Sequence, residues 1–197
     1  MDTWNINGCT LEYDDDTHTY LVDGLIVPSV TQILQIKFSS KYNFVKRDVL
    51  QAAAERGTAI HKAVENYCKD GIPTCQEAKN FRWLKYQYNF SVLENETPII
   101  IFKNDMPVAA GRLDLVLDID GETAIADIKT TSTLDKEYLA YQLNLYRLGY
   151  TQSYGIQVHE LYGVHLRENI RKIHRIPVND RIAYSILEEY ERSVGHE

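Results

Sequence analysis

"GRLDLVLDIDGETAIADIKTT", residues 111–131, alternates apolar and polar side chains on both sides of one Asp-Gly pair. Alternation with a period of two is typical of β-strands, and Asp-Gly is the strongest short hairpin signal. We therefore expect a hairpin with a two-residue turn at 120–121. A turn of that length sets Asp114 opposite Asp127 and Arg112 opposite Lys129.

This register separates the charged and the apolar side chains of the hairpin. Asp114, Asp127 and Lys129 are expected to share one face. The other face carries Leu113, Leu115, Leu117, Ala124, Ala126 and Ile128. Directly opposed residues have Cβ atoms about 4.5–5.5 Å apart, so two carboxylates there repel each other unless a cation lies between them.

Carboxylate oxygens are hard ligands, which favour Mg²⁺ or Mn²⁺ in such a place. The simpler interpretation is a solvated sheet face with scattered charge. The metal hypothesis depends on the register, because a slip of one residue in the turn would send the two acids to opposite faces.

Length and composition predict one domain, residues 1–197, with a substantial core, since 44% of the residues are hydrophobic. The three cysteines (Cys9, Cys68 and Cys75) are odd in number and lack CxxC spacing. Structural disulfides and a zinc knuckle are therefore not expected, and a reducing cytoplasm is the default location. We see no signal peptide and no apolar run long enough for a membrane span.

The net charge of −7 argues against a generic nucleic-acid coat, but the charge is uneven along the chain. Basic groups dominate residues 37–62 and 164–175. Local positive stripes on an acidic protein fit a phosphate track beside an acidic, metal-binding pocket. Ordinary solvated faces are the alternative, and charge alone does not reject it.

The remaining patterns predict helices and strands in a mixed order. The Asp-rich segment 14–16 is expected to be a hairpin turn rather than a calcium loop, because it lacks EF-hand spacing. A short helix is expected to start after an N-cap at Ser29. Further helices are expected over 41–54, 58–69, 76–93, 136–151 and 180–193. The expected strands cover 9–13, 18–22, 96–103, 108–119, 122–129, 157–166 and 170–176. This order predicts an α/β fold, with an N-terminal hairpin and helices in 1–93, a sheet core in 94–177 and a C-terminal helix in 178–197.

Two helical pairs add polar groups to the hairpin. His61 and Glu65 lie one turn apart, as do Gln142 and Tyr146. A lone helical histidine is more often packed or at the surface, and by periodicity Tyr146 suits the core and Gln142 the surface. The remaining histidines, His18, His159, His165, His174 and His196, show no ligand spacing with His61.

Four segments of the chain, by their order and spacing, resemble motifs of the PD-(D/E)xK nuclease superfamily. "GRLDLV…ADIKTT" is similar to its acid and D-x-K motifs. "RGTAIH" and "QLNLY" resemble the histidine and Q-x-x-x-Y motifs of the branch with RecB-type and Cas4-type exonuclease domains. "VDGLIVPSVTQIL" is similar to the opening of phage-borne members. The resemblance runs from about residue 19 to residue 150, and Leu113 replaces the proline of the family name.

The resemblance implies a restriction-endonuclease-like mixed β-sheet flanked by α-helices and a set of site residues. His61, Asp114, Asp127 and the backbone carbonyl of Ile128 would hold Mg²⁺ or Mn²⁺. Lys129 would orient or deprotonate the attacking water. The other implied residues are Gln142 and Tyr146 as catalytic partners, Arg56, Lys62 and Tyr146 as nucleic-acid contacts, and Glu65 and Glu96 as outer-shell acids.

The implied function is a metal-dependent DNA exonuclease in recombination, repair or phage DNA processing. DNA single strands or duplex ends would be its substrate, and a recombination or single-strand-binding protein is a possible partner. Alternatives are a structure-specific endonuclease of the same superfamily or a non-catalytic DNA-binding module. An iron oxygenase would need a second histidine beside the first acid, and residues 112–118 contain none. No iron–sulfur cluster is expected, since no cysteine follows Cys75, and no Walker A motor sequence is present.

Overall fold

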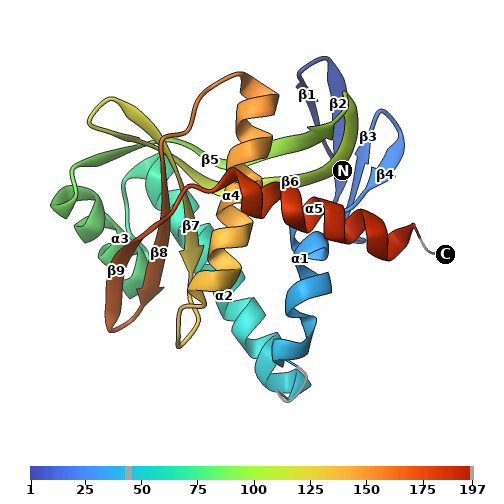
Figure 1. The fold of residues 1–197 in the computed structure, drawn as a ribbon. Coiled ribbons are helices and arrows are strands. Elements are labelled where there is room, and N and C mark those ends of the chain that lie inside the picture. Colours follow the sequence, from blue (N-terminus) through green and yellow to red (C-terminus); the bar gives the residue numbers. More distant parts are fainter. Residues whose placement is uncertain (43–45, 196–197) are drawn as a thin grey trace.

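A computed structural model describes residues 1–42 and 46–195 of the chain (Figure 1). The helices are α1 (Val30–Phe38), α2 (Arg47–Asp70), α3 (Gln76–Gln87), α4 (Lys136–Tyr154) and α5 (Asp180–Val194), with a short 3-10 helix η1 (Ser39–Tyr42). The strands are β1 (Asp2–Ile6), β2 (Cys9–Asp14), β3 (Thr19–Val22), β4 (Leu25–Val27), β5 (Phe90–Lys103), β6 (Met106–Ile119), β7 (Glu122–Lys129), β8 (Glu160–Arg167) and β9 (Ile170–Ile176).

The larger sheet has five strands in the order β5-β6-β7-β8-β9. Only β7 and β8 are parallel neighbours in it, and α4 makes the crossover between them (Figure 1). The predicted mixed α/β class is therefore confirmed. No helix in the described ranges is long and apolar enough to cross a membrane.

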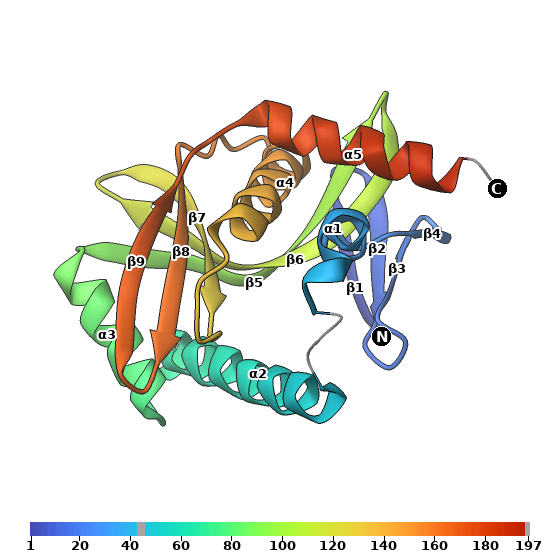
Figure 2. The same cartoon turned by 60° about the horizontal axis from the view of Figure 1, so that its bottom comes forward.

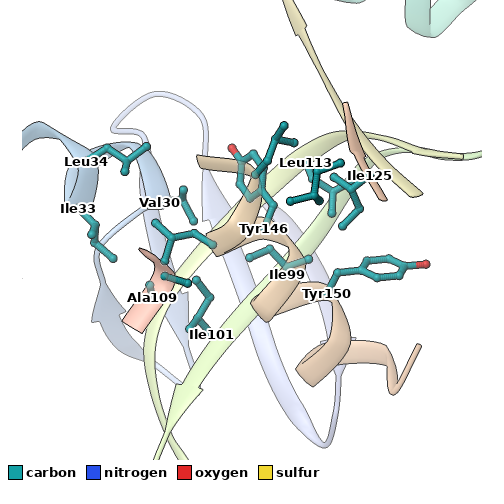
Figure 3. Close-up of a cluster of buried hydrophobic side chains, with 14 of the residues drawn as sticks. Val30, Ile33, Leu34, Ile99, Ile101, Ala109, Leu113, Ile125, Tyr146 and Tyr150 are labelled. Carbon is teal, nitrogen blue, oxygen red and sulfur yellow. The ribbon is translucent and has the colours of Figure 1, made fainter. Parts of the chain in front are cut away.

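Helices cover both faces of this sheet (Figure 2). One buried cluster joins α1, α4 and α5 to the sheet, and Figure 3 shows part of it around Val30, Ile99 and Tyr146. A second cluster joins α2 and α3 to the opposite face through Val64, Phe81 and other apolar side chains. Since each face is buried, the register of the sheet strands is fixed by packing as well as by hydrogen bonds.

A second sheet, β1-β2-β3-β4, packs against β5 and β6. Leu11 and Val22 from this sheet share a buried cluster with Ile100 and Ala110. The backbone N–H of Ala110 donates to the Pro28 carbonyl at 3.0 Å, just before α1 begins. The predicted hairpin at 9–22 is confirmed as β2 and β3, but β1 and β4 were not predicted.

The predicted break between helices 41–54 and 58–69 is wrong, because α2 is continuous through Gly57. A glycine inside a helix costs only about 1 kcal/mol relative to alanine, which the packed face of α2 can offset. Gly57 lies against the strand end, where an added Cβ would be 3.4 Å from Thr130 Oγ1. Residues 43–45 of the predicted first helix lie outside the described residues.

The helix predicted over 76–93 ends at Gln87, and β5 begins at Phe90. Phe81 and Leu84 are buried as expected, but Tyr88 is 51% exposed and lies beyond the helix. Val92, which continues the apolar spacing of the predicted helix, belongs to β5 instead. The C-terminal helix is confirmed as α5, while residues 196–197, including His196, lie outside the described residues.

The central hairpin has the predicted turn register, with Ile119 opposite Glu122 and Leu115 opposite Ala126. Both turn residues have positive φ, 55° at Asp120 and 87° at Gly121, as a type I′ turn requires. The β6–β7 ladder ends at Leu115–Ala126, so Asp114–Asp127 and Arg112–Lys129 are not ladder pairs.

Beyond that point β6 leaves β7 and continues along β5, with Arg112 opposite Pro98. Leu113 consequently packs in the cluster with α4, while Leu115 and Leu117 pack in the cluster with α2. The expectation that Leu113 shares their face is therefore wrong.

Candidate metal centre

Asp114 lies where β6 and β7 separate. Its Oδ2 accepts a hydrogen bond from the Ile128 backbone N–H at 2.6 Å. The carboxylate thus satisfies a strand donor just past the last β6–β7 ladder pair. This contact holds the acid of β6 beside the last residues of β7.

Three side chains from three elements converge at this point. Ligand atoms of His61 in α2, Glu96 in β5 and Asp114 in β6 all lie within 4.8 Å of one another. His61 Nδ1 is 3.4 Å from Asp114 Oδ1, and His61 Nε2 is 3.0 Å from the Ile128 carbonyl oxygen. Two carboxylates, an imidazole and a carbonyl oxygen form a donor set that fits Mg²⁺ or Mn²⁺ through its oxygens.

Glu96, which the resemblance implies as an outer-shell acid, lies beside His61 and Asp114 in this group. It lies on β5 between Asn95, opposite Leu115, and Thr97, opposite Leu113. Its φ of 53° is a left-handed conformation that non-glycine residues adopt infrequently. The chain therefore holds an unusual backbone conformation where this carboxylate meets Asp114.

Asp127 is outside the three-residue group because it pairs with Lys129. Lys129 Nζ lies 2.7 Å from Asp127 Oδ2 and donates to Gln142 Oε1 at 2.8 Å. Gln142 Nε2 in turn donates to the Tyr146 hydroxyl at 3.3 Å. Asp127, Lys129, Gln142 and Tyr146 thus form a connected polar chain between β7 and α4.

Burial and charge set the protonation of the two acids in opposite directions. Burial raises the pKa of Asp127 to about 6, with the Asp114 charge adding to it against the opposing Lys129 ammonium. For Asp114, burial alone raises the pKa, but His61 and Lys129 outweigh it and lower the value. Asp114 is therefore the acid that stays ionised, which suits a ligand.

The two bases respond to the same carboxylates. Burial by itself lowers the pKa of His61, but Asp114 and Asp127 outweigh it and raise the value to about 9. Burial opposes ionisation of Lys129 as well, and the same two acids nevertheless raise its pKa. Both groups are cationic without a metal, so the charges of Asp114 and Asp127 are offset by His61 and Lys129.

The cluster opens to solvent through a cavity of about 620 Å³. Its lining includes Ser29, Val30 and Thr31 at the start of α1, Ala54, Gly57, Thr58 and His61 in α2, and the strand residues Glu96, Gly111, Arg112, Asp114 and Lys129. A cavity of about 340 Å³ shares His61 and Glu96 with it, and one of about 290 Å³ shares Lys129. The site therefore lies in the middle of an extended hollow rather than in a closed pocket.

The residues predicted to contact nucleic acid have different surroundings. Arg56 Nη2 donates to the Thr130 carbonyl at 3.0 Å, next to Lys129. Lys62 is 63% exposed, and its ammonium lies 2.9 Å from a Glu65 carboxylate oxygen. Both residues line the cavity of about 340 Å³ beside His61. Tyr146 lines the main cavity but is only 5% exposed, so little of its side chain is accessible to a ligand.

Arg112 was not among the predicted site residues. Its Nε is 2.8 Å from Glu96 Oε2, and its guanidinium lies 5.4 Å from the centre of the Tyr13 ring. It therefore holds the Glu96 carboxylate in place, and it lines the same cavity as His61 and Asp114. The signal was its place two residues before Asp114, which puts both on the same face of β6.

No family model and no curated protein matches this chain. Among solved structures, the chain is similar to the crystal structure of SSO0001, with a TM-score of 0.50 and 16% sequence identity. The alignment covers 87% of this chain and 76% of that chain. At this identity the likeness concerns the fold alone.

Proposed function

We propose that this protein is a metal-dependent nuclease that hydrolyses phosphodiester bonds in DNA. The observation that supports this most strongly is the place of Lys129. Its ammonium is held 2.7 Å from Asp127 and 2.8 Å from Gln142, in the cavity that also contains His61, Glu96 and Asp114. A fixed cation next to a set of metal ligands is what attack on a phosphodiester requires.

His61, Glu96, Asp114 and the Ile128 carbonyl are the groups that would hold the cation, with Asp127 the remaining candidate. When bound, Mg²⁺ or Mn²⁺ supplies polarisation of a phosphate oxygen and a lower pKa for water. Asp114 suits the role of permanent ligand because its pKa is lowered by His61 and Lys129. Binding requires His61 to be neutral, so the proton that it shares with Asp114 must leave.

Lys129 donates hydrogen bonds toward the water or the phosphate that enters the cavity. Its raised pKa favours the ammonium form, which offsets charge that develops on the phosphate. Gln142 fixes the ammonium from α4, and Tyr146 fixes Gln142 through its hydroxyl. These two residues position Lys129, and Arg56 lies close enough to the strand end to contact a flanking phosphate.

Exonuclease action remains the leading form of the proposal, and it rests on the sequence resemblance. The extended hollow on both sides of the site also suits an endonuclease, because a chain could pass through it in either case. A non-catalytic DNA-binding module is less favoured, since binding alone has no use for Asp127 and Lys129 buried as a pair.

The decisive experiment uses end-labelled linear and closed circular DNA, single- and double-stranded, with Mg²⁺, Mn²⁺ or EDTA. Degradation of linear substrates alone indicates an exonuclease, and cutting of circles indicates an endonuclease. Cleavage that persists in EDTA contradicts the metal-dependent mechanism. Absence of cleavage on every substrate, with DNA binding retained, supports the binding module instead.

A further inference from the structure

The outward face of α3 combines aromatic and basic side chains. Lys79, Arg82, Trp83 and Tyr86 follow each other at helical spacing and are all exposed, with Tyr86 at 76%. The opposite face, which carries Ala78, Phe81 and Leu84, is fully buried against the sheet. These four exposed residues, together with Arg171, are called the α3 surface below.

The positive charges of the α3 surface are not neutralised by neighbours. In the described part of the chain, Lys79, Arg82 and Arg171 form no ion pair. The Arg171 guanidinium instead lies 4.2 Å from the centre of the Trp83 ring. This basic and aromatic surface lies on a protein whose net charge is −7.

The α3 surface is connected to the proposed active site through the β8–β9 turn. Asn80, buried on the inner side of α3, donates to the carbonyl oxygens of Arg167 at 2.7 Å and Glu168 at 3.2 Å. Arg167 and Arg56 both donate to the Thr130 carbonyl, which directly follows Lys129. Figure 2 shows α3 beside β9, at the same end of the sheet as the β8–β9 turn.

We propose that the α3 surface binds a single-stranded segment of nucleic acid outside the active site. Exposed aromatic rings next to unpaired cations are how proteins bind single strands, through base stacking and phosphate contacts. Trp83 and Tyr86 provide the stacking faces, and Lys79, Arg82 and Arg171 provide the phosphate contacts. The β8–β9 turn links α3 to Thr130, which directly follows Lys129, so this assignment deepens the proposed nuclease function and rests on it.

An acidic peptide or an anionic lipid surface could use the same cations. A surface helix binds lipid by inserting a free apolar face into the membrane interface, and the apolar face of α3 is already buried in the protein. The interleaving of rings and cations therefore favours nucleic acid over both.

The test measures binding of fluorescent oligothymidine, about 25 and about 8 nucleotides long, to the full-length protein in EDTA. The variant is Arg82→Ala/Tyr86→Ala. The matched control is Arg181→Ala/Tyr184→Ala, which removes an exposed arginine and a 47% exposed tyrosine from α5. We expect roughly tenfold weaker binding of the long strand by the variant and none of this loss in the control.

The salt dependence separates a contact from a structural effect. Loss of one phosphate contact should reduce the slope of log K against log salt by about 0.7. Equal affinity of variant and control for the long strand, or no binding by the wild type, overturns the proposal. It is also overturned if the variant loses binding of polyglutamate or of phosphatidylserine vesicles but keeps its affinity for the strand.

Cleavage assays on the same variants separate the two proposals. If the wild type cleaves no DNA but the α3 variant still binds the long strand more weakly, the nuclease proposal fails and the α3 surface stands. If the wild type cleaves DNA and the variant binds and degrades long strands equally well, the α3 surface alone fails.

Discussion

Lys129 and Gln142 form a hydrogen bond of 2.8 Å that joins the last residue of β7 to the second turn of α4. Gln142 is 6% exposed, so the amide is fixed by its surroundings before any ligand arrives. The Lys129 ammonium therefore has a defined direction in the cavity. Preorganisation of this kind is where most transition-state stabilisation in enzymes arises.

Lys129→Ala should abolish cleavage but leave the candidate metal ligands His61, Glu96 and Asp114 in place. The variant removes the cation that offsets charge on the phosphate, so we expect a roughly 10²–10⁴-fold lower rate of DNA hydrolysis. Steady-state cleavage with Mn²⁺ measures it, and Lys103→Ala, which breaks a peripheral pair with Glu191, is the control. Wild-type rates for Lys129→Ala in a nuclease-free preparation would refute the assigned role.

Gln142→Leu should lower the rate through the orientation of Lys129 and not through metal binding. We expect a roughly tenfold to hundredfold loss of turnover, because misplacement of a reacting group by about 1 Å has this effect. Tyr146→Phe keeps the ring and removes only the hydroxyl that accepts from Gln142 at 3.3 Å, so its loss should be smaller. Turnover of both variants is measured on the same labelled DNA strand. A larger loss for Tyr146→Phe than for Gln142→Leu would contradict the proposal that Tyr146 acts on Lys129 through Gln142.

Glu96→Gln should weaken Mn²⁺ binding, whereas Glu65→Gln should not. Glu96 shares the metal-capable group with His61 and Asp114, while Glu65 is paired with Lys62 and Lys69. We expect at least a roughly 10–100-fold loss of affinity for Glu96→Gln, the loss typical even of supporting residues. Titration calorimetry of both variants measures it, and equal affinities would place Glu96 outside the site.

Turn chemistry made the central hairpin predictable from sequence. Asp120 and Gly121 specify a type I′ turn, and that turn sets the register that brings Asp114 close to β7. The N-cap at Ser29 was predictable for a similar reason, since its side chain accepts from Gln32 N at 3.1 Å in a capping box. Both features depend on interactions within a few residues.

The features that sequence did not reveal depend on distant contacts. The sequence named Glu96 only as an outer-shell acid, because its place beside Asp114 depends on a positive φ inside β5 and on the guanidinium of Arg112. Strands β1 and β4 form only because other strands pair with them. Gly57 looked like a helix end, but the packing of α2 on the sheet overrides a weak local preference.

Ser29→Ala should destabilise the protein by about 1 kcal/mol, because it removes the hydrogen bond that caps α1. Ser29 also lines the main cavity, so the variant tests whether the start of α1 must be fixed. Urea unfolding measures the change, with Ser193→Ala on α5 as the control at an exposed helical serine. No loss of stability would mean that the tertiary contacts of α1 suffice without its cap.

Asp127→Asn should stabilise the protein in EDTA, with a characteristic dependence on pH. The pKa of Asp127 is raised from its ordinary 3.8 to about 6, first by burial and then by Asp114. The folded state therefore holds this proton more tightly than the unfolded state does. The resulting stabilisation is fully present below pH 3.8 and is lost as the pH rises to about 6.

The variant carries no proton to lose, so its advantage over the wild type should grow between those two pH values and stay constant above them. A shift of this size corresponds to no more than about 3 kcal/mol, and it already includes the attraction between Lys129 and the ionised Asp127. Unfolding in EDTA at several pH values measures the difference, with Asp120→Asn in the exposed turn as the charge-matched control. A variant less stable than the wild type at neutral pH would show that the attraction between Asp127 and Lys129 outweighs the repulsion between the two acids.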